Sequence, residues 1–177
     1  NTGYNPFTAE GKKTAGLEIW DWHRKADLRF PISKLKLFIP VGDGNIISGI
    51  HKGFRDLISL GWIEKSPQIF GIQAVGSAAI ANAFFSGTEK IIPVQAKTIA
   101  DSISVDLPRD GVRAVRAATE TEGRYLLVSD DEILAAIATL GNVGIFAEPA
   151  GATAYAGLVK AVQTGLVDSK DPVLVLN

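Results

Sequence analysis

Residues 37–49 read Leu-Phe-Ile-Pro-Val-Gly-Asp-Gly-Asn-Ile-Ile-Ser-Gly, and this stretch decides the fold. The apolar run that ends at Pro40 predicts a short buried strand, and the apolar residues from Ile46 onward recur with helical spacing. Gly42 and Gly44 stand between the two and allow the backbone to turn tightly and to approach a ligand. Because the first N–H groups of a helix have no partner within the helix, this arrangement favours an anion such as phosphate.

Two interpretations of this loop stay open at the level of the sequence. One is a phosphate site, and the other is a plain strand-to-helix turn in which glycine serves only its backbone freedom. The fingerprints of nucleotide-binding loops do not fit, because no Lys-Ser/Thr pair follows the glycines and the spacing differs from the dinucleotide motif. A phosphate that belongs to a cofactor, bound without magnesium, fits the pattern better.

The alternation of strand and helix continues along the chain. We expect strands at residues 35–39, 68–75, 103–105, 125–128 and 173–176, and helices at 8–24, 46–58, 77–85, 110–120, 129–140 and 149–164. Apolar strands that alternate with helices are typical of an α/β fold with three layers, a parallel sheet with helices on both faces. The sequence has no internal repeat, low-complexity stretch or linker, so residues 1–177 are expected to form a single α/β domain.

Local capping signals predict several helix ends. Thr8 is a candidate N-cap of the first helix, and Asp110 is expected to cap a later one. Ser129 followed by Glu132 has the spacing of a capping box. Gly61 stands where the end of a helix needs the left-handed backbone conformation.

Composition and charge narrow the class of protein. Hydrophobic residues make up 46% and charged residues 21% of the chain, as in a soluble globular protein, and the net charge is -1, so neither nucleic acid nor a membrane is expected as a partner. With no cysteine and two histidines, a disulfide framework is excluded and a histidine-rich metal site is not expected. The apolar runs are too short to span a bilayer and no signal peptide is recognisable, so we expect a cytoplasmic protein. The sequence also lacks methionine, and we expect it to be a fragment of a longer gene product.

Residues 40–49, which read P-V-G-D-G-N-I-I-S-G, resemble the phosphate-binding loop of fold-type II pyridoxal-phosphate (PLP) enzymes, which often reads P-V-G-G-G-G-L-I-S-G. Four more segments are similar to this family and follow its order: E-G-K-K-T at 10–14, T-I-A-D-S-I at 98–103, V-S-D-D-E-I at 128–133 and F-A-E-P-A-G-A at 146–152. The first of these is similar to threonine synthases, and the second to a segment that threonine synthases share with threonine dehydratases. The resemblance covers nearly the whole chain and is closest to threonine synthases.

The resemblance implies that backbone amides of Gly42, Asp43, Gly44, Asn45 and Ile46 cradle the phosphate of the cofactor PLP. It assigns no catalytic residue and no metal ligand to this chain. Asp43 departs from the glycine-rich form, and its carboxylate is unfavourable beside a phosphate unless it turns to solvent or to a cation. Asn45 departs from it too, but its side-chain amide can donate a hydrogen bond.

In the family, the lysine that binds PLP lies upstream of the phosphate loop in a serine-rich S-F-K-D-type motif, and this sequence has no such motif. Lys12 and Lys13 match a different stretch of the family pattern, so the resemblance gives them no catalytic role. We therefore expect the chain to be the C-terminal part of the PLP-binding large domain. It is expected to need the missing N-terminal half as a partner and to be inactive alone.

The resemblance also implies that the complete protein is a lyase of amino-acid metabolism with a small-molecule amino-acid substrate. The first expectation is threonine synthase, which converts O-phosphohomoserine to threonine and phosphate in threonine biosynthesis. A serine/threonine dehydratase-like PLP lyase is the alternative within the family, and a non-catalytic phosphate- or PLP-binding module is the alternative outside it. Family members are often dimers, which makes a homodimer a candidate assembly.

Overall fold

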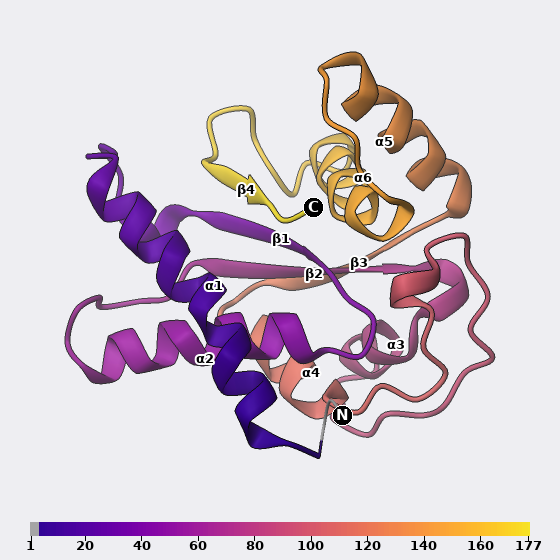
Figure 1. Cartoon of the computed structure of the whole chain (residues 1–177), viewed down its shortest axis with the longest axis horizontal. Coiled ribbons are helices and arrows are strands. Elements are labelled where there is room, and N and C mark those ends of the chain that lie inside the picture. Colours follow the sequence, from indigo (N-terminus) through magenta and orange to yellow (C-terminus); the bar gives the residue numbers. More distant parts are fainter. Residues whose placement is uncertain (1–3) are drawn as a thin grey trace.

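A sheet of four parallel strands lies at the centre of the computed structural model, which describes residues 4–177 (Figure 1). The strands are β1 (Lys36–Pro40), β2 (Gln68–Ala74), β3 (Arg124–Val128) and β4 (Val173–Val175). They lie in the order β3-β2-β1-β4, and Phe38 of β1 pairs with Phe70 of β2 and with Val175 of β4. The central strands β1 and β2 are mostly apolar on both faces, as is usual for strands between two helix layers.

Helices cover the sheet on both faces. Within residues 4–177 the α-helices are α1 (Pro6–Lys25), α2 (Asn45–Ser59), α3 (Ala79–Phe85), α4 (Gly111–Glu120), α5 (Asp130–Asn142) and α6 (Pro149–Gln163), and the short 3-10 helices are η1 (Ile32–Lys34), η2 (Val75–Ser77) and η3 (Asp101–Ile103). Figure 1 shows α5 and α6 on one face of the sheet and α1 to α4 on the other. The predicted three-layer α/β fold is confirmed. In this described part of the chain, no helix is both long and apolar enough to cross a membrane.

The side chains of β1 alternate between two hydrophobic clusters. Leu37 and Ile39 belong to the cluster that contains the buried residues of α2 and α4, and Phe38 belongs to the cluster around α6. Phe38 stacks on Phe70 of β2, with the ring centroids 4.9 Å apart. Full burial of a large apolar side chain stabilises the fold by about 1.5–3 kcal/mol, so this alternation fixes the strand between its two helix layers.

Two of the predicted helix ends are confirmed. At the start of α5, Ser129 Oγ accepts a hydrogen bond from the Glu132 N–H at 3.2 Å, and the Glu132 carboxylate accepts one from the Ser129 N–H at 2.6 Å. After α2, Gly61 has a φ of +71°. Both ends are set by residues close in sequence.

The predicted N-cap at Thr8 is wrong. Helix α1 begins at Pro6, and the side chain of Asn5 accepts a hydrogen bond from the Phe7 N–H at 3.0 Å. Proline suits the first helical position because its fixed φ is helical and its missing N–H would have no partner there. Asn5 and Pro6 therefore start the helix before Thr8 is reached.

The predicted strand at residues 103–105 is also wrong. Asp101–Ile103 forms η3, and the residues after it do not join the sheet. The buried Ser77 hydroxyl donates to the Ile103 carbonyl at 3.1 Å and accepts from the Val105 N–H at 3.0 Å. A side chain thus takes the hydrogen bonds that a neighbouring strand would have made.

Helices α1 and α2 pack in very close contact through glycine. A Cβ atom placed on Gly16 would lie 2.8 Å from the Ile50 carbonyl oxygen, and one placed on Gly49 would lie 2.4 Å from the Lys12 Cβ. Any larger residue at these positions would force the helices apart. The close approach sets the Lys12 side chain against the first turns of α2.

Candidate functional site

Residues 41–44 connect the carboxyl end of β1 to the start of α2. Val41 is fixed at both of its backbone groups. Its N–H donates to the Ile72 carbonyl at 2.9 Å, and its carbonyl accepts from the buried Gln73 side-chain amide at 3.1 Å. The loop therefore leaves the sheet from a rigid point at the carboxyl ends of the strands, where open α/β sheets bind ligands.

Glycine is required at both glycine positions of the loop. Gly44 has a φ of +85°, a backbone conformation that costs other residues about 1–2 kcal/mol. A Cβ atom there would also lie 2.8 Å from the Ala114 Cβ of α4. At Gly42, a Cβ atom would lie 2.8 Å from the Ile103 Cα of η3. The loop is thus enclosed between α4 and η3.

The start of α2 has unpaired hydrogen-bond donors. Ser48 is the first residue of the helix whose N–H donates within the turn, to the Gly44 carbonyl at 3.2 Å. Across residues 4–177, no acceptor takes a hydrogen bond from the backbone N–H groups of Gly42, Gly44, Asn45, Ile46 and Ile47. Such groups carry the positive end of the helix dipole and suit an anion.

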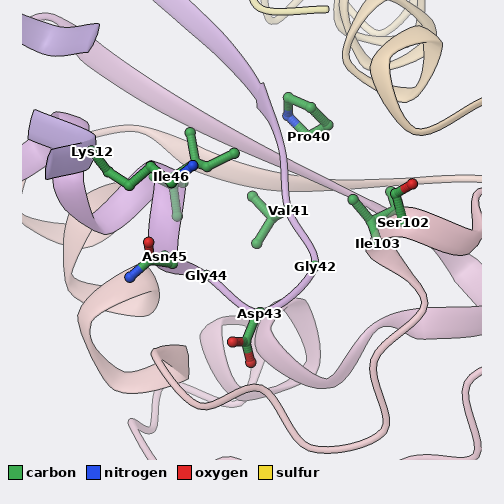
Figure 2. Close-up of a pocket in the computed structure, with 11 residues that line it drawn as sticks. Lys12, Pro40, Val41, Gly42, Asp43, Gly44, Asn45, Ile46, Ser102 and Ile103 are labelled. Atoms are coloured by element: carbon green, nitrogen blue, oxygen red, sulfur yellow. The ribbon is translucent and has the colours of Figure 1, made fainter. Parts of the chain in front are cut away.

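A cavity of about 200 Å³ opens beside this loop (Figure 2). Its walls come from the loop, the first turn of α2, α1 and η3, namely Lys12, Pro40, Val41, Gly42, Asp43, Gly44, Asn45, Ile46, Ile47, Ser102 and Ile103. The structure therefore brings together the five residues of the predicted phosphate loop and adds to them one cation from α1 and two residues of η3.

Lys12 is a wall residue that the sequence patterns did not assign to the site. Figure 2 shows its side chain extended toward Ile46. Within the described residues Lys12 makes no hydrogen bond or ion pair, whereas the neighbouring Lys13 contacts Glu10 at 2.8 Å and Asp56 at 3.0 Å. The ammonium group of Lys12 is thus available to a ligand.

Asp43 and Asn45, the two departures from the glycine-rich pattern, both contact the start of α4. Asp43 Oδ1 accepts from the Arg109 N–H at 2.6 Å, and the Asp43 carbonyl accepts from the Asp110 N–H at 3.0 Å. In Figure 2 the Asp43 carboxylate points away from the other labelled side chains. The Asn45 Nδ2 donates to Asp110 Oδ2 at 2.7 Å, so this side-chain donor forms a hydrogen bond within the protein instead of facing a ligand.

Asp110 stands at the N-cap position of α4, as predicted, but it does not cap the helix. Its side chain accepts no hydrogen bond from a backbone N–H group of the first turn of α4. The carboxylate instead contacts Asn45 and forms an ion pair with Arg113. Arg113 lies within the first turn of α4, whereas Asn45 is distant in sequence and lies outside the local pattern that indicated a cap.

A family profile described as pyridoxal-phosphate dependent enzyme matches residues 1–177. The chain belongs to this family. PLP is accordingly the cofactor of the enzymes to which this chain is related. Among residues 4–177, no group of His, Asp and Glu side chains is arranged to hold a metal ion.

Relatives within the family carry the name threonine synthase. The protein from Methanosarcina acetivorans is 37% identical over 174 residues, which cover 97% of this chain and 42% of that protein. The protein from Mycobacterium tuberculosis is 38% identical over 165 residues, which cover 92% of this chain and 42% of that protein. The chain therefore spans less than half the length of these relatives.

Solved structures share the fold at lower identity. The threonine deaminase from T.th. has a TM-score of 0.73 and 21% identity, with 97% of this chain and 56% of that chain covered. The serine racemase of Dictyostelium discoideum has a TM-score of 0.66 and 22% identity, with 96% and 49% covered. At these identities the likeness concerns the fold alone.

Proposed function

We propose that residues 42–46 hold the phosphate of PLP through the backbone N–H groups of Gly42, Asp43, Gly44, Asn45 and Ile46. The observation that carries this proposal is the set of unpaired N–H groups at the start of α2. An anion bound there gains charge-assisted hydrogen bonds and the helix dipole. The glycines favour the same assignment, because the backbone borders the cavity without side chains that would fill it.

The charges around the cavity also fit a phosphate. The Asp43 carboxylate, which would repel an anion, accepts a hydrogen bond from the Arg109 N–H and points away from the other labelled side chains in Figure 2. The Lys12 ammonium group reaches the cavity from α1. We propose that Lys12 contributes a cation to the bound phosphate.

We infer that the chain is a single domain and the C-terminal part of the large domain of a cytoplasmic PLP-dependent lyase, with a homodimer as its assembly. Threonine synthase is the first candidate, supported by relatives of that name at 37% and 38% identity. Bound PLP supplies the electron sink for chemistry on an amino-acid substrate. Residues of this chain bind and orient its phosphate, and Val41 and Ile103 exclude water from one side of the cavity.

The lysine that binds PLP is proposed to lie outside residues 1–177, in the portion of the enzyme that corresponds to the rest of the relatives' length. Glu10 and Asp56 raise the pKa of Lys13 through hydrogen bonds, which keeps its amine protonated and non-nucleophilic. We expect the 177-residue chain to show no lyase activity. Borohydride reduction with PLP followed by peptide mapping tests this, and one stoichiometrically labelled lysine that supports turnover would contradict it.

A serine/threonine dehydratase-like lyase is the second candidate, because residues 98–103 resemble a segment that threonine synthases share with threonine dehydratases. A non-catalytic phosphate-binding module is the third. The complete protein should be assayed with O-phosphohomoserine, L-threonine and L-serine. Release of phosphate from the first supports a synthase, release of ammonia from the others supports a dehydratase, and no turnover with bound PLP supports the module.

The cofactor site itself is tested by titration of the protein with inorganic phosphate and with PLP. We expect the backbone ¹H–¹⁵N resonances of Gly42, Gly44, Asn45 and Ile46 to shift and saturate with both ligands. A truncated ligand without phosphate, pyridoxal, should leave these resonances nearly unchanged. Saturable shifts confined to another part of the chain would remove this loop from the cofactor site.

A further inference from the structure

Asp110 is a buried carboxylate that joins the phosphate loop to α4. The residue is 3% exposed. It accepts a hydrogen bond from Asn45 Nδ2 at 2.7 Å and forms an ion pair with Arg113 of α4. An unpaired buried carboxylate would be strongly destabilising, so these two partners are what allow the charge to remain at this position.

The orientation of the Asn45 amide follows from this carboxylate. A carboxylate accepts hydrogen bonds and cannot donate them, so it selects the orientation with Nδ2 toward Asp110. The Asn45 Oδ1 is buried and has no hydrogen-bond partner within residues 4–177. The contact with Asp110 is thus the side-chain hydrogen bond that fixes the first residue of α2.

A second set of contacts holds the other side of Gly44. The Asp43 carbonyl accepts from the Asp110 N–H at 3.0 Å, and Asp43 Oδ1 accepts from the Arg109 N–H at 2.6 Å. The turn before α4 therefore forms hydrogen bonds with Asp43 and Asn45, the residues on both sides of Gly44. Gly44 itself packs closely against α4, since a Cβ atom there would lie 2.8 Å from the Ala114 Cβ, and the hydrogen bonds on either side of it hold the loop at this distance.

We propose that Asp110 is a positioning residue for the phosphate loop. Its carboxylate, paired with Arg113, holds the Asn45 side chain and so aims the N–H groups at the start of α2 before a ligand arrives. This inference rests on the proposed function of the loop and adds to it the cause of its preorganisation. Where the glycine-rich pattern has flexible glycines, this chain has Asp43 and Asn45, which form hydrogen bonds with residues at the start of α4.

The first experiment measures loop order in the ligand-free protein, so it does not depend on phosphate binding. We expect the ¹⁵N order parameters of Gly42, Gly44 and Ile46 to be about 0.85 in the wild type and to fall toward about 0.6 in Asp110→Ala. The matched control is Tyr125→Phe, which removes a 2.9 Å hydrogen bond to the Ala114 carbonyl of the same helix and keeps the hydrogen bonds of Asp110 with Asn45 and Asp43. Unchanged order in Asp110→Ala, or an equal fall in the control, would overturn the proposal.

The second experiment measures the affinity for inorganic phosphate in Asp110→Ala, Asn45→Ala and the double variant, each well below its melting temperature. We expect each single variant to bind phosphate roughly five- to twentyfold more weakly than the wild type. The double variant should bind about as well as the single variant with the lower affinity, because the two residues act through one contact. Additive losses would overturn the proposal, as would wild-type affinity in Asp110→Ala.

Asp110→Asn is the conservative variant for both measurements. It keeps the size of the side chain and an oxygen that can accept from Asn45, so loop order and phosphate affinity should lie between those of the wild type and Asp110→Ala. If Asp110→Ala does not fold, Asp110→Asn is measured in its place. Loop order and phosphate affinity equal to those of the wild type in Asp110→Asn would then contradict the proposal. If the wild type binds no phosphate, the proposed function fails, and the order measurement still decides the role of Asp110.

Discussion

Ser77 and Ile103 are joined by a buried hydrogen bond in which Ser77 Oγ donates to the Ile103 carbonyl at 3.1 Å. The same hydroxyl accepts from the Val105 N–H, so Ser77→Ala leaves two backbone groups without a partner. We expect the free energy of unfolding to fall by about 1–3 kcal/mol, as measured by urea unfolding. Ser59→Ala is the control, because Ser59 Oγ donates to the Arg55 carbonyl on an exposed helix surface. An equal loss in both variants would contradict the prediction.

Gly44→Ala is expected to destabilise the protein more than Gly61→Ala does. Both glycines have a positive φ, +85° and +71°, so either substitution costs about 1–2 kcal/mol of backbone strain. A Cβ atom at Gly44 would also lie 2.8 Å from the Ala114 Cβ, whereas one at Gly61 meets no atom within 4 Å. The crowding adds about 1–3 kcal/mol. Chemical denaturation of both variants measures the difference. An equal loss of unfolding free energy in both would contradict the prediction, because α4 would then move away from the added Cβ atom at no energetic cost.

Lys12→Gln is expected to weaken the binding of inorganic phosphate about two- to fivefold, the effect of losing one partly solvated charge pair. The difference from the wild type should shrink as salt is raised, since salt screens the interaction. The control is Lys13→Gln, because the Lys13 ammonium group is already held by Glu10 and Asp56. Isothermal titration at low and high salt measures the affinities, and an equal effect of both substitutions would remove Lys12 from the site.

His51 is expected to make the stability of the protein depend on pH. Burial lowers its pKa below the ordinary value, although the Glu120 carboxylate at 3.4 Å acts in the opposite direction and Arg55 assists the lowering. As pH falls, the unfolded chain binds a proton at this histidine before the folded protein does. The contribution of the neutral His51 to the free energy of unfolding is therefore fully present above about pH 6.5, the pKa of histidine in the unfolded chain. It is lost as pH falls toward the lower pKa of His51 in the folded protein.

Urea unfolding between about pH 5 and 7.5 measures this dependence. His51→Gln should flatten the slope in that range. A slope that survives in His51→Gln would assign the effect to other groups.

Features that depend on neighbouring residues could be predicted from the sequence. The capping box of Ser129 and Glu132 closes within one helical turn. The strand, loop and helix of residues 37–49 follow from apolar spacing and two glycines. Five of the residues that line the cavity, residues 42–46, could be singled out in this way because they are consecutive in the chain, and their role in phosphate binding stays a prediction.

Features that depend on distant partners could not be predicted. Residues 103–105 look like a strand, but the Ser77 hydroxyl and the space left by Gly42 decide their conformation. Asp110 has the position of a helix cap, and yet Asn45, 65 residues away, takes its carboxylate. Lys12 enters the cavity because two helices cross at a particular distance, which no local pattern encodes.

The close approach of Gly49 to Lys12 makes the position of the Lys12 side chain depend on the spacing of α1 and α2. A residue larger than glycine at position 49 would push α1 outward and withdraw the Lys12 amine from the cavity, while every residue of the loop stayed the same. A substitution at position 49 would thus change the charge beside the cavity without replacing any residue that lines it. Glycine at position 49 is for this reason part of what places a positive charge at the cavity, although it does not line the cavity itself.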